Sequence, residues 1–325
     1  MKKYLVISFF LVSLASFAQK PVAIIFDTDI GPDYDDVGAM AILHALADKG
    51  EAKILATISC NAFETTAPTL SVLNTYFNRP DIPIGITKTS LPNKACGQEW
   101  AQAIIHKYPH ALASNEQAAD AVKLYRKILA AQPDSSVTMV SVGFFTNLAH
   151  LLSSTADEYS SLNGKELIIK KVKKLVSMAA RIDKDGIGGY EFNVMVDAQS
   201  SKKVFAEWPT TFILSGFEIG EKILTGIRLI NNDSISNSPV KDAFHIALQK
   251  DNNLVGRNSW DETAVLVAVR GIDPYFSFRK INFSIQDDGK DIVIPGEKFI
   301  YLQFKESPEV IGRVIEDLMM HRPGK

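Results

Sequence analysis

The chain has 325 residues, of which 46% are hydrophobic and 22% charged, and its net charge at pH 7 is −2. These values are typical of an ordinary globular protein, and the lack of a basic excess argues against nucleic acid as a partner. The length suits one large α/β domain or two smaller domains.

The first 18 residues are predicted to be a signal peptide. A positive start (MKK) precedes the apolar run YLVISFFLVSLA, and SFA places small residues before a cleavage site after Ala18. A membrane-spanning helix needs about 20 apolar residues, so we expect this segment to be removed. The mature protein would then be periplasmic or secreted, with no membrane contact. Residues 19–325 are expected to form a single domain.

After residue 20, short apolar strands alternate with helical segments. Apolar runs predict strands at 22–26, 53–59, 82–86, 137–142, 174–179 and 210–215. Helical periodicity predicts helices at 35–48, 116–131 and 197–207. This alternation indicates an α/β protein with an open, mostly parallel sheet covered by helices on both faces. Ligands of such sheets bind beyond the carboxyl ends of the strands.

The C-terminal part has a different pattern. Residues 259–271 and 307–320 have the periodicity of helices, whereas 281–295 and 298–305 are predicted to be antiparallel strands, with a turn at DDGK. Neither a low-complexity linker nor a repeat divides the sequence. We therefore expect one domain with an additional antiparallel C-terminal part. Its two cysteines, Cys60 and Cys96, are expected to be separate buried thiols, although an exported protein could join them.

Five aspartates stand within ten residues, in DTDIGPDYDD (27–36), where the first predicted strand ends. Helix capping accounts for one or two of them, and solvated turn acids are the alternative for the rest. Carboxylates at this density suit Ca²⁺ or Mg²⁺, and a cation would relieve their repulsion and acidify a bound water. An EF-hand starting at Asp27 fails, because Pro32 and Gly38 occupy its required glycine and acidic positions. An aspartyl-phosphate phosphatase also places DxD after its first strand and stays open as an alternative.

Five segments, in order, resemble the inosine-uridine-preferring nucleoside hydrolase family. DTDIGPDYDDVGAM resembles the family signature DxDxGxDDAxA, with two extra residues before the double aspartate. The other segments are ATISCN, SVGFFTNLAHLL, YEFNVMVDAQSSKKVF and SWDETAVL, and the match extends from residue 22 to about residue 270. The family fold, a mostly parallel α/β sheet with one Ca²⁺ at the strand ends, agrees with the predicted elements.

The resemblance implies a site for Ca²⁺ and a small-molecule ribonucleoside. The implied metal ligands are Asp29, Asp36, Asp261 and the backbone carbonyl of Thr146. The groups implied to bind ribose hydroxyls are Asp35, Asn61, Glu191 and Asn193. Asp27 would support the site from behind. The implied reaction is hydrolysis of the N-glycosidic bond of a ribonucleoside, or of a related ribosyl compound, by a Ca²⁺-held water that Asp29 activates. Family members are often dimers or tetramers, which leaves a homo-oligomer open.

One position departs from the family. Well-known members carry a histidine directly before the last metal-binding aspartate, where this chain has Trp260, and of its six histidines only His150, in SVGFFTNLAHLL, lies in a matched segment. An indole stacks well on a base but is a poor acid, so we expect Trp260 to bind the base by stacking. Leaving-group activation is assigned to no single residue: the candidates are Tyr190, Arg181, Arg257 or no residue at all. Asp33 belongs to the extra residues and takes no role from the family. A non-catalytic ribosyl-ligand binding protein and a metal-dependent phosphohydrolase are the alternatives to the hydrolase.

Overall fold

The computed structural model describes residues 20–90 and 92–324. The predicted signal peptide, residues 1–18, lies outside the described residues. Within them, no helix combines the length and the apolar character that a membrane span requires. Cys60 and Cys96 are both buried and free.

A ten-stranded sheet runs through the molecule in the order β11-β12-β8-β6-β5-β1-β2-β3-β4, and β7 pairs with β12. The strands are β1 (Val22–Thr28), β2 (Ala52–Ser59), β3 (Ile84–Ile86), β4 (Ala119–Asp120), β5 (Val137–Ser141), β6 (Val172–Met178), β7 (Gly188–Tyr190), β8 (Thr211–Ser215), β11 (Phe276–Ile285) and β12 (Lys290–Phe304). All neighbours from β12 through β8 to β4 are parallel. The antiparallel pairs are β11–β12 and β12–β7. A separate pair joins β9 (Leu224–Thr225) to β10 (Arg257–Asn258).

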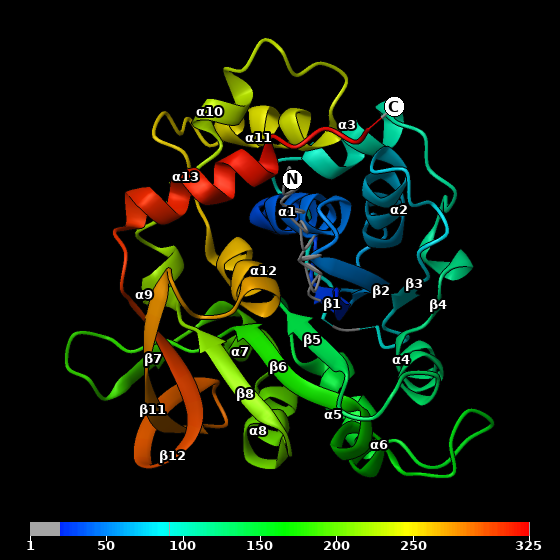
Figure 1. Ribbon diagram of the computed structural model, residues 1–325, viewed down its shortest axis with the longest axis vertical. Helices are drawn as coiled ribbons and strands as arrows, with labels where there is room; N and C mark the ends of the chain where they lie inside the picture. Colours follow the sequence, from blue (N-terminus) through cyan, green and yellow to red (C-terminus); the bar gives the residue numbers. More distant parts are fainter. Residues whose placement is uncertain (1–19, 91, 325) are drawn as a thin grey trace, which may run out of the picture.

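Helices cover both faces of this sheet (Figure 1). One layer contains α1 (Asp35–Asp48), α2 (Thr66–Tyr76), α3 (Trp100–Lys107), α11 (Pro239–Lys250), α12 (Trp260–Arg270) and α13 (Pro308–Met319). The other contains α4 (Ala121–Ala130), α5 (Thr146–Ser153), α6 (Gly164–Lys171) and α8 (Ala198–Glu207). Short turns of helix are η1 (Asn115–Gln117), α7 (Phe192–Val196), α9 (Phe217–Gly220) and α10 (Ile227–Ile230). The predicted fold class, an α/β protein with a mostly parallel covered sheet, is confirmed.

The central strand β1 shows why the chain folds into these layers. Its side chains alternate between the two faces, so that Ile24 and Phe26 join the core under α1 and α12, whereas Ile25 joins the core under α4 and α5. Helix α1 is buried along residues 35–46, on all its sides rather than along one stripe. A helix that is apolar all round belongs in the interior, and α1 lies there between the sheet and the outer helices.

Two predicted regions, one helix and one pair of strands, differ from the structure. The helix predicted at 116–131 begins only at Ala121, because the Asp120 carboxylate caps it by accepting the N–H of Lys123. Strands were predicted at 281–295 and 298–305. The structure instead has β11, which ends at Ile285, and a single 15-residue strand, β12, which runs from Lys290 to Phe304. Gly296, with φ +133°, continues β12 past Pro295 opposite a register shift at Ile281–Asn282. A proline–glycine pair that predicts a break is here an irregularity within one strand.

The sheet order places a topological switch at β1. The chain builds β2, β3 and β4 outward on one side of β1 and then returns to add β5, β6 and β8 on the other side. Residues that follow β1 and β5 therefore meet at the carboxyl end of the sheet, where open α/β sheets bind their ligands. Asp29 follows β1, and Val142 follows β5.

Candidate active site

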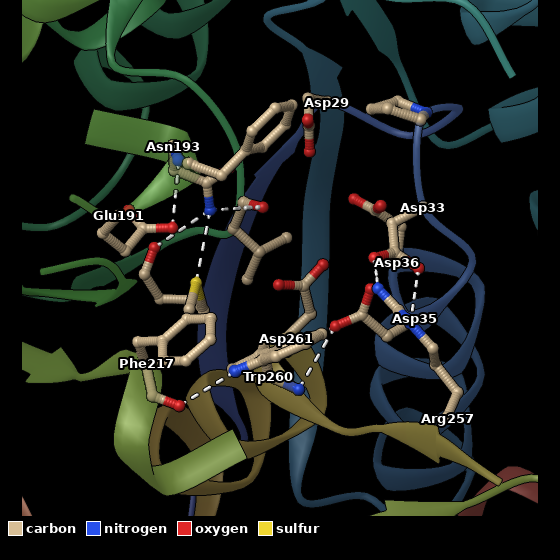
Figure 2. A pocket seen from close by; sticks show the side chains of 14 residues that line it. Asp29, Asp33, Asp35, Asp36, Glu191, Asn193, Phe217, Arg257, Trp260 and Asp261 are labelled. Carbon is tan, nitrogen blue, oxygen red and sulfur yellow. Dashed lines mark hydrogen bonds and ion pairs between the residues drawn. The ribbon is translucent and has the colours of Figure 1, made fainter. Parts of the chain in front are cut away.

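A cavity of about 320 Å³ opens at this switch point. Its lining residues are Asp29, Pro32, Asp33, Asp35, Asp36, Val142, Met178, Glu191, Phe192, Asn193, Phe217, Arg257, Trp260 and Asp261. Figure 2 shows Glu191 and Asn193 on one side and Asp33, Asp35 and Asp36 on the other, with Asp29 and Asp261 between them. Seven of nine predicted site residues thus line one cavity, although they come from three distant segments of the sequence.

Three carboxylates converge where the first turns of α1 and α12 meet. Asp35, Asp36 and Asp261 each offer one carboxylate oxygen, and these atoms all lie within 4.8 Å of one another. Asp35 accepts the backbone N–H groups of Trp260 and Asp261, each at 3.2 Å, and so caps α12 from α1. The hydroxyl of Thr28 donates to Asp36. These contacts fix the three carboxylates as a group.

Asp29 stands on the cavity wall beside this group. Its backbone is approached closely by the loop after β5, where a Cβ built on Gly143 would lie 2.4 Å from the Asp29 nitrogen. Only glycine fits there, which explains the glycine that follows β5 in SVGFFTN. Asp29 is nearly fully buried, as are the three convergent aspartates.

The buried aspartates repel one another. Burial is the largest cause that raises the pKa of Asp29 well above its ordinary value, followed by the charge of Asp35. Burial and neighbouring carboxylates likewise hold the pKa values of Asp35, Asp36 and Asp261 well above the ordinary range. Four buried carboxylates facing one cavity without a matching set of cations are costly. An all-oxygen set of this charge fits a hard divalent cation such as Ca²⁺.

Thr146, the predicted carbonyl ligand, is the first residue of α5 and does not line the cavity. It is buried, and its hydroxyl donates to Asp197. The converging carboxylates include Asp35, which was predicted to bind ribose, rather than Asp29.

Glu191 and Asn193 are held rigidly on the opposite wall. The two oxygens of Glu191 accept the N–H groups of Asn193 and Val194, each at 3.0 Å, and so cap α7. Burial raises the pKa of Glu191 to about 7, against the lowering effect of those hydrogen bonds. The amide nitrogen of Asn193 donates to the carbonyls of Val142 and Met178 at 3.3 and 3.2 Å. Its amide oxygen accepts no hydrogen bond from residues 20–90 or 92–324 and is the end that can receive a ligand hydroxyl.

Asn61 does not reach the cavity. Its amide nitrogen donates to the carbonyls of Asp29 and Lys94, at 2.9 and 2.8 Å. Its amide oxygen accepts the N–H groups of Phe63 and Lys94, at 3.3 and 2.9 Å. All four bonds go to backbone, so in this structure Asn61 fixes the loop that carries Asp29.

Asp27 lies behind the site, as the family resemblance implies. The hydroxyl of Tyr125 donates to it at 2.7 Å, and the amide of Asn147 donates at 3.1 Å. Burial raises the pKa of Asp27 to about 7, although these hydrogen bonds act to lower it. Asp27 thereby joins β1 to α4 and α5 beneath the Asp29 loop.

Trp260 and Phe217 form an aromatic wall of the cavity. Their rings lie 5.2 Å apart and are inclined by 31°, and the indole N–H donates to the Phe217 carbonyl at 2.9 Å. A Cβ on Gly220 would lie 2.3 Å from the indole, so the glycine makes room for this ring.

Arg257 also lines the cavity. Of the other candidates for leaving-group activation, Tyr190 donates to Asp288 and Arg181 pairs with Asp183, and neither lines the cavity. Among the residues that the structure describes, no histidine lines the cavity either.

Phe217, which lines the cavity, and Glu262, which follows Asp261, are among the residues that were not predicted from the sequence. Phe217 belongs to no matched segment. Glu262 follows Asp261 and is fully buried, with both carboxylate oxygens lacking a hydrogen bond in the described part of the chain. A Cβ on Gly38 would lie 2.1 Å from Glu262 Oε1, so the glycine in α1 makes room for this acid. The sequence signal that could have identified Glu262 was an acidic residue in the otherwise apolar run that follows SWD.

Known proteins share the sequence pattern and the fold of this chain. A family model described as inosine-uridine preferring nucleoside hydrolase matches residues 24–310. No curated protein matches the chain. Similar solved structures include such a hydrolase from Bacillus anthracis, with 14% identity, a TM-score of 0.68 and coverage of 92% of this chain and 99% of that one. A plant nucleoside hydrolase has 16% identity, a TM-score of 0.66 and the same two coverages. The type III effector XopQ, solved with adenosine diphosphate ribose, has 15% identity, a TM-score of 0.70 and 93% coverage of each chain.

Structural similarity at these identities establishes the fold alone, whereas the family model spans most of the chain. The converging carboxylates and the Glu191–Asn193 wall come from the same segments that carry the family resemblance. On this evidence the chain belongs to the inosine-uridine preferring nucleoside hydrolase family.

Proposed function

We propose that the protein hydrolyses the N-glycosidic bond of ribonucleosides, in a Ca²⁺-dependent reaction, to ribose and a free base. One observation supports this most strongly: a group of carboxylates and a Glu191–Asn193 pair face each other across one cavity, with Asp29 between them (Figure 2). Such a cavity can hold a polyhydroxylated sugar from two sides. It also surrounds the sugar with negative charge, which suits the positive charge that builds on the ribose ring as this bond breaks.

Asp36 and Asp261, with Asp29 on the wall beside them, would hold the ion, and the family resemblance adds the carbonyl of Thr146, which does not line the cavity in this structure. Asp35 stands in the same group of carboxylates and would bind either the ion or a ribose hydroxyl. When bound, a divalent cation lowers the pKa of a water in its shell and fixes hydroxyl groups of the sugar.

Asp29 would accept the proton of the attacking water. The water oxygen forms a bond to the anomeric carbon of the ribose, and the bond from that carbon to the base nitrogen breaks. The electron pair of the broken bond leaves with the base, which takes up a proton. Orientation of the reactants alone contributes about 7–11 kcal/mol where the geometry is ideal. No covalent sugar–protein intermediate is needed.

The remaining cavity residues would bind the two ends of the substrate. Glu191 and Asn193 would bind hydroxyls of the ribose. Trp260 would present its ring to the base, as predicted from the sequence, and the neighbouring Phe217 extends that apolar wall. Loss of a base–aromatic contact costs about 1–3 kcal/mol of binding free energy. We therefore expect Trp260→Ala to raise KM by the factor that corresponds to this loss.

The proposal is tested on purified mature protein with a panel of ribonucleosides, with and without a chelator. Release of reducing sugar that the chelator abolishes and Ca²⁺ restores is the expected result. Binding of nucleosides without sugar release would identify a ribosyl-ligand binding protein instead. Release of phosphate from nucleotides would identify a phosphohydrolase.

A further inference from the structure

Arg257 is the one arginine, lysine or histidine among the described residues that line the cavity. Its Nε donates to Asp33 Oδ1 at 2.9 Å, and its Nη2 donates to Asp33 Oδ2. The pair is partly shielded, with 24% of the arginine side chain and 29% of the aspartate side chain exposed. Two parallel bonds to one carboxylate fix the plane of a guanidinium as well as its position.

Two aromatic rings also contact this guanidinium. Its central carbon lies 4.9 Å from the Trp260 ring centroid and 5.4 Å from that of Tyr34. Asp33 and Tyr34 lie between Gly31 and Asp35, a stretch two residues longer than in the family signature. The extra residues and Trp260, which are departures from the family pattern, therefore meet around Arg257.

The guanidinium keeps donors that no protein group uses. Asp33 occupies the edge formed by Nε and Nη2, and within the described chain Nη1 donates no hydrogen bond. Burial lowers the pKa of Arg257, but the charges of Asp33 and Asp35 outweigh it and raise the pKa above its ordinary value. The group therefore stays cationic and can donate hydrogen bonds, but it cannot transfer a proton.

The proposed reaction needs such a group. When the bond to the ribose breaks, its electron pair and a negative charge move onto the base. Most of the cavity's charged groups are carboxylates, which repel that charge. A fixed donor aimed at a developing negative charge inside a shielded site is among the strongest catalytic devices known in enzymes.

We propose that Arg257 is a catalytic residue that donates a hydrogen bond to an acceptor atom of the leaving base, and that Asp33 is the residue that positions it. The proposal rests on the hydrolase function proposed above. The electron pair of the broken bond stays on the base, Arg257 stabilises it there, and the proton that completes the free base comes from solvent.

The test compares two ribosides that differ in their leaving groups. Inosine releases a poor leaving group, whereas p-nitrophenyl riboside releases a stable anion that needs little help. We expect Arg257→Gln to lower kcat/KM for inosine by about 100-fold or more, the loss seen when one such donor is removed. The same variant should lower kcat/KM for p-nitrophenyl riboside by less than about 5-fold on the same reasoning. Asp33→Asn should show the same selectivity with a smaller loss.

Arg270→Gln is the matched control. Arg270, on α12, makes the same two-bond contact with Glu51, at 2.8 and 2.9 Å, with 25% and 34% of the side chains exposed, but lies outside the cavity. It should leave the ratio of the two kcat/KM values unchanged. As a second measurement, millimolar guanidinium should restore inosine hydrolysis to Arg257→Ala.

Equal losses on both substrates in Arg257→Gln, or no loss on either, would overturn the role of Arg257 while leaving the hydrolase intact. A wild-type protein that releases ribose from neither substrate would overturn the proposed function and this inference together.

Discussion

Asp35 accepts the backbone N–H of Asp261 at 3.2 Å, across a separation of 226 residues in the sequence. This bond locks the start of α1 to the start of α12. The positive ends of both helix dipoles then point toward the carboxylates in their first turns, which offsets part of the mutual repulsion. A bound cation would offset the rest. The carboxylate geometry that is unfavourable without an ion is therefore the geometry that binds one.

Removal of one converging carboxylate should release the metal. In Asp36→Ala or Asp261→Ala, we expect Ca²⁺ retention and turnover to be lost. Excess Ca²⁺ should stabilise the wild-type protein by about 2.7 kcal/mol at one hundred times its Kd, and should no longer do so in the variants. Elemental analysis and thermal unfolding with chelator or Ca²⁺ measure both effects. Asp287→Ala is the control, because Asp287 is an exposed acid that does not line the cavity. Full Ca²⁺ occupancy in Asp261→Ala would remove that residue from the site.

The rigid Glu191–Asn193 wall should make the protein selective for ribose. A site built to bond a hydroxyl rejects the analogue that lacks it by as much as about 10⁴-fold, because a buried polar group is left unpaired. We therefore expect 2′-deoxyribonucleosides to have a far lower kcat/KM than ribonucleosides. Asn193→Ala should narrow this difference, because it should lower kcat/KM for ribonucleosides and leave kcat/KM for 2′-deoxyribonucleosides unchanged. Equal kcat/KM values for the two sugars in the wild-type protein would contradict the assignment.

The sequence was informative where function restricts the choice of residue. Asp29, Asp36 and Asp261 could be assigned to one site because their segments resemble those of the family in the same order, and the structure does bring them to one cavity. The place of Asn61 could not be predicted, since its four backbone partners depend on how the loop near Lys94 folds back over the Asp29 loop. The motif identifies the residue type but not the groups with which its side-chain amide forms hydrogen bonds.

Long-range packing explains the other residues that the sequence did not reveal. Phe217 faces Trp260 only because β8 ends beside α12, and Arg257 meets Asp33 across 224 residues. A single strand at 290–304 could not be predicted either, because its second half is stabilised by pairing with β8, far earlier in the chain. No local pattern records such contacts.

Export should follow from the N-terminal segment. We expect the mature protein to begin at Gln19 and to be found outside the cytoplasm, because a charged start, a short apolar run and small residues precede that position. N-terminal sequencing of protein from cell fractions measures this directly. Replacing Leu11 by Arg should interrupt the apolar run and retain the precursor in the cytoplasm. An intact Met1 on wild-type protein from the cytoplasm would refute the prediction.

Buried His44 should make the protein less stable in mild acid. Burial, and then the charge of Arg79, lowers the pKa of His44 to about 3, and its Nε2 lies 3.1 Å from the Asn74 amide oxygen. Between pH 6.5 and about pH 3 the unfolded chain therefore binds a proton that the folded chain does not, so stability falls as the pH falls, by about 1.4 kcal/mol per pH unit. From pH 6.5 to 5, His44→Gln should lose about 1.5 kcal/mol less unfolding free energy than wild type, as measured by urea denaturation in chelator. His110→Gln should follow wild type, and identical slopes in wild type and His44→Gln would show that His44 is protonated in the fold.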